Sequence, residues 1–355
     1  MKNIKNSLRK IKSIAYKEIL HIIRDIRTLI LSLIIPVFLL IIFGYAIRLD
    51  IQNVSLSFFD FKNDYFTREL KETLKNSSVF SKIFNEYDLK EDKFLKNEIK
   101  GKIFIPSNLK EIVIIIDGSD PTLFSTLSGY MIRMLGEKEN IFDLRYKILF
   151  NPELKSEIFI VPGIIAIILV VISAVLVAIS ISKEYETGSF YTLFTLPLKP
   201  YEIIIGKVIP YILIGLTQFT LVLIFGKILF NIPLRGNFLF LYLSTIIYIL
   251  SGLSIGIIVS TKFKKTQTAL QVTWLTTILP SFLLSGFIFP IENIPFLLRI
   301  LTYFVPARYF LELLRANLLR NSEIFYMLDE LFFLILLSFI LIFIALKSIK
   351  KEILT

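Results

Sequence analysis

Apolar residues lie along this chain in long uninterrupted runs separated by polar segments. Six runs are long enough for a membrane helix, since a hydrocarbon core about 30 Å thick requires roughly 20 apolar residues. They cover residues 29–47, 159–182, 208–230, 238–260, 270–291 and 331–346, of which the last is the shortest. The pattern predicts an α-helical polytopic membrane protein with six transmembrane helices.

The first 28 residues have a helical period instead of a continuous apolar run. Apolar side chains recur at steps of three and four, at Ile4, Leu8, Ile11, Ala15, Ile19, Ile22 and Ile26. Basic side chains are available to the other side, including Lys5, Arg9, Lys12 and Arg24. A basic amphipathic helix before a span lies in the headgroup plane. We therefore expect residues 1–28 to form an interfacial helix, which either only anchors the chain or also binds a partner.

Residues 48–158, between the first two predicted spans, have the pattern of a mixed α/β domain. "VSLSFFDF", "KGKIFIP", "EIVIIIDG" and "LRYKILF" read as strands, "TRELKETLKN" reads as a helix, and a further helix is expected over 121–138. Strands mixed with helices over a domain-sized segment predict an inserted α/β domain. It is the part of the chain that could project far from the bilayer.

Charge placement predicts how the chain is oriented. The formal net charge is +11, which in a soluble chain would suggest nucleic acid. Here the basic surplus collects at alternate membrane edges: before the first span, between spans four and five, and after span six. Because Lys and Arg favour the cytoplasmic side, both termini, including the tail 350–355, are expected inside. The domain 48–158 is then extracytoplasmic.

The sequence contains no recognisable motif for ATP hydrolysis or ion coupling that could drive transport. "IIIGKV" and "LIFGKI" lack the glycine and Ser/Thr of a phosphate-binding loop, and the six spans hold no Asp, Glu or His, only Lys227 near the end of span three. There is no Cys, and the single His21 lies on the interfacial helix. Asp117 and Asp120 in "DGSDP" fit a strand end and a helix N-cap better than a metal site. We expect no catalytic, cofactor or metal site, so transport would need energy from a partner chain.

One cytoplasmic segment is neither an apolar span nor a minimal turn. Residues 183–207, "KEYETGSFYTLFTLPLKPYEIIIGK", join spans two and three and are acidic at one end and broken by two prolines. Within the region 159–349 that holds spans two to six, this is the place where a stiff element could receive force from outside. On pattern alone, an ordinary interfacial loop explains the segment equally well.

The sequence of this segment resembles the coupling loop of export-type ABC transporter permeases, the type-2 ABC membrane-domain family. Its acidic start, Pro-containing turn and Gly206-Lys207 follow that family's order. In the family this loop contains the helix that docks on the ATPase. The resemblance implies that the residues coupling to the ATPase are Lys183, Glu184, Tyr185, Glu186, Gly188, Leu196, Pro197 and Pro200.

Other stretches resemble the same family in the same order. "KEILHIIRDIRTLILSLIIPVFLLIIFGYAI" is similar to its interfacial helix and first span, which implicates Lys17, Glu18, Arg24, Asp25 and Arg27. "YFVPARYFLELLRANLL", within the segment 292–330, resembles its outer interfacial segment, with Pro306, Arg308 and Arg315. Two short helices at the outer interface are expected there. The resemblance covers nearly the whole chain and is to the subgroup with a large external domain between the first two spans.

The resemblance implies the membrane-spanning permease subunit of an ATP-driven ABC exporter in the bacterial cytoplasmic (inner) membrane. Two permease chains, identical or closely related, would sit in the lipid bilayer on a dimer of ABC ATPase subunits, which use ATP and Mg. This chain would bind no cofactor and no nucleic acid. Many relatives have a periplasmic membrane-fusion adaptor as a further partner, and the external domain would be its dock.

Three alternatives are kept beside this interpretation. A membrane receptor with an external ligand-binding domain would need a cytoplasmic output domain, and an ion-coupled carrier would need acidic residues in its spans. The sequence argues only weakly against the third alternative, a channel or structural scaffold. Gly252 and Gly256 form a G-x-x-x-G in span four, which fits either packing within one subunit or a dimer face.

Overall fold

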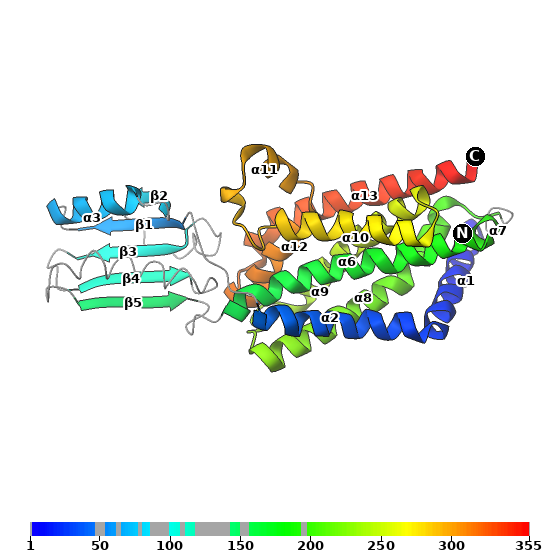
Figure 1. The fold of residues 1–355 in the computed structure, drawn as a ribbon, viewed down its shortest axis with the longest axis horizontal. Coiled ribbons are helices and arrows are strands. Elements are labelled where there is room, and N and C mark those ends of the chain that lie inside the picture. The colour runs from blue at the N-terminus through cyan, green and yellow to red at the C-terminus, as the bar shows by residue number, and fades with distance from the viewer. Residues whose placement is uncertain are drawn as a thin grey trace.

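The computed structural model describes residues 2–46, 54–61, 65–76, 80–85, 99–106, 111–117, 143–149, 156–192 and 197–354. The chain has two parts, a small β-sheet domain and a long bundle of helices (Figure 1). The sheet domain lies at one end of the bundle. Both chain termini lie at the other end.

The bundle contains all six apolar runs that the sequence predicts to be spans. Its helices are α2 (Ile26–Ala46), α6 (Ser156–Glu186), α8 (Pro200–Phe230), α9 (Phe238–Lys262), α10 (Thr266–Leu283) and α13 (Leu328–Leu354). Among the described residues, the four helices α6, α8, α9 and α13 are long and apolar enough to cross a membrane. In α2 the apolar helix described in full is shorter, Ser32–Gly44. These helices are those of a polytopic membrane protein.

The fifth predicted span, 270–291, is helical over only part of its length. Helix α10 ends at Leu283, and the chain then bends through Gly286, which has φ +82. A residue with positive φ cannot continue a right-handed helix, and glycine adopts this conformation at little cost. The apolar residues after Leu283 therefore leave the helix, so this part of the prediction was wrong.

The sheet domain is a mixed α/β unit, as predicted. Its described elements are β1 (Val54–Asp60), α3 (Tyr65–Asn76), β2 (Phe80–Asn85), β3 (Gly101–Ile105), β4 (Glu111–Asp117) and β5 (Asp143–Leu149). The strand order is β2-β1-β3-β4-β5, with β3 and β4 antiparallel and the other neighbours parallel. Strand β2 was not predicted. The helix expected over 121–138 lies outside the described residues, as does Asp120.

Helix α6 forms the centre of the bundle, and glycines of α9 allow close packing against it. A Cβ on Gly252 would lie 3.0 Å from the Val170 carbonyl oxygen, and one on Gly256 would lie 2.2 Å from that of Ala174. Both glycines therefore serve packing within one subunit, which decides between the two alternatives left open by the sequence.

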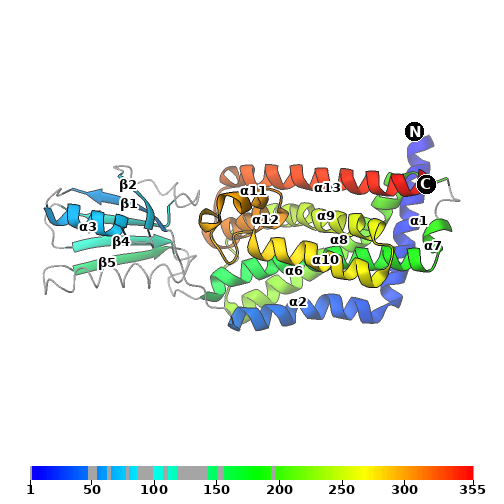
Figure 2. The same cartoon turned by 45° about the horizontal axis from the view of Figure 1, so that its top comes forward.

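Helix α1 (Lys2–Arg24) crosses the end of the bundle where the termini lie (Figure 2). It is separated from α2 by a break at Asp25. Its buried face includes Ile14, Ala15 and the charged Glu18, whereas Leu8 and Ile26 of the predicted apolar face are exposed. The helix is amphipathic as expected. Its packed face is rotated towards Glu18, because ion pairs and not only apolar contacts hold it.

The segment between α10 and α13 contains η1 (Ile291–Asn293), α11 (Phe296–Thr302), α12 (Pro306–Arg315), a π-helical turn η2 (Ala316–Arg320) and η3 (Ile324–Met327). The two predicted short helices correspond to α11 and α12. Helix α11 stands off the bundle and is largely exposed (Figure 1). Helix α12 is instead buried against α6, α9 and α13, with Phe310 fully enclosed.

Candidate functional site

The connection from α6 to α8 is shorter than the predicted loop 183–207, because helix extends into it from both sides. Helix α6 continues to Glu186, and Gly188, with φ +74, makes the turn into the short α7 (Ser189–Thr192). Helix α8 begins at Pro200, whose fixed φ suits the first helical position. Leu196 lies outside the described residues. Only residues 187–199 connect the two long helices.

Three buried charged side chains and one partly exposed lysine join α1, α6 and α8. Lys207 Nζ lies 2.6 Å from Glu18 Oε1 and 2.7 Å from Glu184 Oε2. Lys17 Nζ lies 2.7 Å from Glu184 Oε1. Lys207 and Glu18 are each 1% exposed, and Glu184 is 8% exposed. We call Lys17, Glu18, Glu184 and Lys207 the ionic joint.

The ionic joint is balanced in charge. Two carboxylates face two ammonium groups, which offsets the large desolvation cost of burying each ion. Glu18 Oε2 also accepts hydrogen bonds from Ser180 Oγ at 3.2 Å and Tyr211 Oη at 3.3 Å. Removing one partner would leave an uncompensated buried charge. The joint therefore favours one relative placement of the three helices.

A glycine on α8 lets α1 come this close. A Cβ on Gly206 would lie 2.7 Å from side-chain atoms of Ile14. On the same contact face, Glu202 accepts a hydrogen bond from Ser7 Oγ and lies 3.6 Å from Lys10 Nζ. Local sequence patterns did not reveal Ser7, Lys10 or Glu202. The residue Gly206 in the Gly-Lys pair was the signal that something packs there.

The predicted coupling residues divide into inward-facing and outward-facing ones. Glu184 belongs to the ionic joint, and Tyr185 is buried against Phe190 with ring centroids 4.1 Å apart. Lys183, Glu186 and Pro197 are exposed. Glu186 accepts hydrogen bonds from Thr266 at the start of α10, at 2.9 Å from the backbone N and 2.6 Å from Oγ1.

The predicted residues around α1 lie at the same end. Asp25 Oδ2 is 3.5 Å from Lys183 Nζ, which adds an exposed tie between the α1–α2 break and α6. Arg24 is exposed. The side chain of Arg27 lies outside the described part of the structure. The structure thus brings Lys17, Glu18 and Asp25 together with the end of α6.

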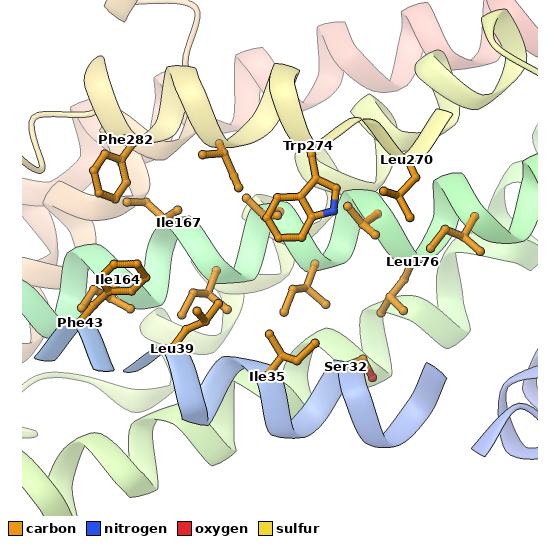
Figure 3. A pocket seen from close by; sticks show the side chains of 16 residues that line it. Ser32, Ile35, Leu39, Phe43, Ile164, Ile167, Leu176, Leu270, Trp274 and Phe282 are labelled. Carbon is orange, nitrogen blue, oxygen red and sulfur yellow. The ribbon is translucent and has the colours of Figure 1, made fainter. Parts of the chain in front are cut away.

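A large apolar cavity lies between α2, α6 and α10 (Figure 3). Its volume is about 460 Å³, which falls within the range of small-molecule sites. Side chains from the three helices point into it, including Ile35, Leu39, Ile167, Leu176, Trp274 and Phe282. A second cavity of about 240 Å³ shares Ser32, Leu176 and Ile179 with the first and reaches Glu18, His21 and Lys183. The apolar space therefore borders a polar one beside the ionic joint.

The predicted outer residues hold α12 in place. Pro306 is its first residue, and the Arg308 guanidinium lies 4.2 Å from the ring centroid of Tyr303. Arg315 lies 3.9 Å from the ring centroid of Phe159 and donates a hydrogen bond to the Gly286 carbonyl at 3.3 Å. These contacts are structural. They connect α12 with α6 and with the bend after α10.

These features define a class of protein: a polytopic membrane protein with a charged joint at one end, an apolar cavity among its helices and a separate sheet domain. Within the described residues, no group of three or more His, Asp or Glu could hold a metal ion. The model of the ABC-2 family transporter protein matches residues 26–347. The chain belongs to this family.

Named relatives agree with this membership. The probable multidrug ABC transporter permease YbhS of Escherichia coli (strain K12) is 28% identical over 372 residues, covering 98% of this chain and 97% of the relative. The probable multidrug ABC transporter permease YbhR of the same organism is 25% identical, covering 87% and 89%. The inner membrane transport permease YhhJ is 25% identical and covers 60% of each chain. The chain is thus a permease subunit of an ABC exporter, and ATP hydrolysis belongs to a partner chain.

Proposed function

We propose that this permease exports apolar or amphipathic small molecules, and that a dimer of ABC ATPases drives it by acting on α1 and on the connection between α6 and α8. The observation that carries the proposal is the ionic joint. It ties α1 to α6 and α8 through ion pairs of 2.6–2.7 Å, two of which are buried. A push on either element would therefore move both long helices.

The ATPase would contact the exposed residues of the connection and not the joint itself. Tyr191 is 50% exposed in α7, and Pro197 and Lys199 are exposed just before α8. Glu184 and Tyr185, which the family resemblance places in the coupling loop, face inward. We assign them the transmission of force. The contact surface consists of Lys183, Glu186 and Gly188 together with the exposed Tyr191, Thr192, Pro197 and Lys199.

The orientation we propose has six spans, both termini in the cytoplasm and the sheet domain outside. Its support is the position of both termini, α1 and the ionic joint at one end of the bundle and of the sheet domain at the other (Figure 1). The basic residues of α1, of the α9–α10 connection and of the end of α13 lie at the terminal end, as the positive-inside rule predicts for a cytoplasmic side. The membrane is the bacterial inner membrane.

The substrate would occupy the apolar cavity and enter past the polar cavity next to the ionic joint. An amphipathic molecule suits this pair of cavities, because its apolar body would fit the apolar cavity and its polar end the adjoining polar cavity. Phe38 on α2 and Leu275 on α10, two of the helices that line the apolar cavity, are exposed. A second permease copy or close relative would cover these side chains. The sheet domain would be the dock for a membrane-fusion adaptor.

Co-purification of the ATPase with detergent-solubilised permease tests the contact surface. The docking variant carries Tyr191→Ala and Lys199→Glu, just before α8. The control carries Phe238→Ala and Arg235→Glu, just beyond the other end of α8; Phe238, like Tyr191, is 50% exposed. We expect the docking variant to lose the ATPase and the control to retain it. Retention by both variants would place the ATPase contact elsewhere and overturn the proposal.

Transport by reconstituted permease–ATPase complex tests the cavity. Val171→Trp fills the space from α6, and Ile335→Trp adds the same side chain on exposed α13. We expect Val171→Trp to abolish transport of ethidium, an amphipathic cation, while ATPase binding stays intact. Ile335→Trp should leave both unchanged. Undiminished transport by Val171→Trp would show that the cavity is not on the substrate path.

A further inference from the structure

The end of the sheet domain nearest the bundle presents one base and one acid side by side. Lys100 precedes β3, and Asp117 is the last residue of β4. The Asp117 backbone N donates to the Lys100 carbonyl at 2.8 Å, which fixes the two residues next to each other. Figure 1 shows this end of β4 pointing towards the bundle.

On the bundle side of this contact lie a basic residue, Arg320, and an acidic residue, Glu312, both in the segment after α11. Arg320 is buried, with Nη1 2.5 Å from Glu312 Oε1 and Nε 3.9 Å from Asp117 Oδ2. Burial alone would raise the pKa of the Glu312 carboxyl, but the charges of Arg320 and Lys100 hold that pKa below its ordinary value. Charges of opposite sign thus alternate across the contact. The guanidinium therefore lies between two carboxylates, hydrogen-bonded to Glu312 and attracted by charge to the more distant Asp117.

The backbone around Arg320 is itself held firmly to the bundle. Arg320 ends the π-helical turn η2, and Asn321 follows with φ +51. π-helical turns are rare and occur often at functional sites. Within the turn, Asn317 Nδ2 donates to the Asn237 carbonyl at 3.2 Å, and Gly236 lies so close to Asn317 that a Cβ there would be 2.4 Å from its carbonyl oxygen. The turn is therefore anchored to the α8–α9 connection.

We infer that Arg320 is a positioning residue that fixes the sheet domain on the helix bundle, so that the domain follows the movement of α12 and of the π-helical turn. Through Asp117 and Glu312 it links a domain and a segment that lie far apart in the sequence. The inference goes beyond the proposed function, because it concerns the sheet-domain end and can be tested without transport.

A distance measurement on the full chain tests this role. Since the chain has no Cys, cysteines introduced at Tyr65 in α3 and Leu297 in α11 would carry the only two spin labels. These positions are 83% and 78% exposed. If Arg320 fixes the sheet domain on the bundle, Arg320→Gln should allow the two parts to move relative to one another and broaden the distance distribution about twofold. Arg320→Lys keeps the positive charge, so its distance distribution should be nearly as narrow as that of the unsubstituted chain.

Two further variants keep the test decisive. Asp117→Asn breaks the same contact from the sheet side and should broaden the distribution in the same way, even if Arg320→Gln fails to fold. Arg235→Gln removes an exposed arginine from the α8–α9 connection and should change nothing. A distribution as narrow in Asp117→Asn and any folded Arg320→Gln as in the unsubstituted chain would overturn the inference.

Discussion

Lys207 is the side chain on which the joint between α1, α6 and α8 depends most. It is the one member of the joint that contacts both carboxylates, Glu18 on α1 and Glu184 on α6. Lys17 contacts Glu184 alone, and its side chain is 39% exposed. A buried charge deprived of its partner costs far more than an exposed ion pair gains. The two lysines therefore differ sharply in what their removal does.

We expect Lys207→Met to lower the free energy of unfolding by about 3–5 kcal/mol, because it leaves two buried carboxylates without their shared partner. Lys17→Met should cost about 0–1 kcal/mol, since water can replace a partly exposed ammonium. Thermal unfolding of the two purified variants in the same detergent compares them. Equal unfolding temperatures would show that the joint contributes little and that α1 is held mainly by apolar contacts.

At the scale of elements, the packing of α9 on α6 leaves no room for a side chain at Gly256. Gly256 faces the backbone of α6, where a Cβ would approach the Ala174 carbonyl oxygen to 2.2 Å. Backbone atoms cannot move aside as a flexible side chain can. Gly226 on α8 provides a contrast, because a Cβ there would find its nearest neighbour, Ile232 Cδ1, at 3.4 Å.

Gly256→Ala should therefore destabilise the protein by about 1–3 kcal/mol, the usual cost of overpacking. Gly226→Ala should be neutral or stabilising by up to about 1 kcal/mol, because alanine has the higher helix propensity and finds room. Both changes add one methyl group to a membrane helix, so differences in hydrophobicity cancel. The idea fails if the two variants unfold at the same temperature.

Elements with strong patterns were predictable from the sequence, and weak ones were not. The apolar runs predicted the six helices, apart from the end of α10, and alternation predicted β1 and β5. A continuous apolar run predicted β4, and β3 was predicted as a short strand. The unpredicted strand β2 is an edge strand in which Phe80, Lys82 and Phe84 alternate with Ser81, Ile83 and Asn85, so neither face is clearly apolar. Such a strand forms because of its pairing with the neighbouring strand, here β1, and not because of its local sequence pattern.

The candidate site was predictable only as a region. Charged residues at the ends of α1 and α6 were identified, but their pairing was not, because Glu18 and Lys207 are 189 residues apart. Local patterns do not reveal which of several lysines meets which carboxylate across a tertiary contact. The same holds for Arg320, whose partner Asp117 lies in another domain. The assignment of the coupling residues to the ATPase stays a prediction.

At the scale of the molecule, helix α6 connects the ionic joint with α12. Helix α6 spans 31 residues, so it is about 46 Å long at 1.5 Å per residue. Near one end Glu184 enters the ionic joint, and near the other Phe159 packs against Arg315. A movement imposed at the joint would reach the α12 segment along this rod. Force transmission across the bilayer along α6 requires the two ends of this helix to lie on opposite sides of the membrane.

Labelling of single cysteines tests this orientation directly, because the chain has no Cys of its own. Tyr65 in the sheet domain and Tyr16 in α1 are 83% and 63% exposed, so a cysteine at either position should be accessible to water-soluble reagent. With a membrane-impermeant maleimide, Tyr65→Cys should react in intact spheroplasts and Tyr16→Cys only after permeabilisation. The reverse order would place the ionic joint outside, beyond the reach of ATP. Reaction of both cysteines before permeabilisation would put the two ends on one side and rule out force transmission through α6 across the bilayer.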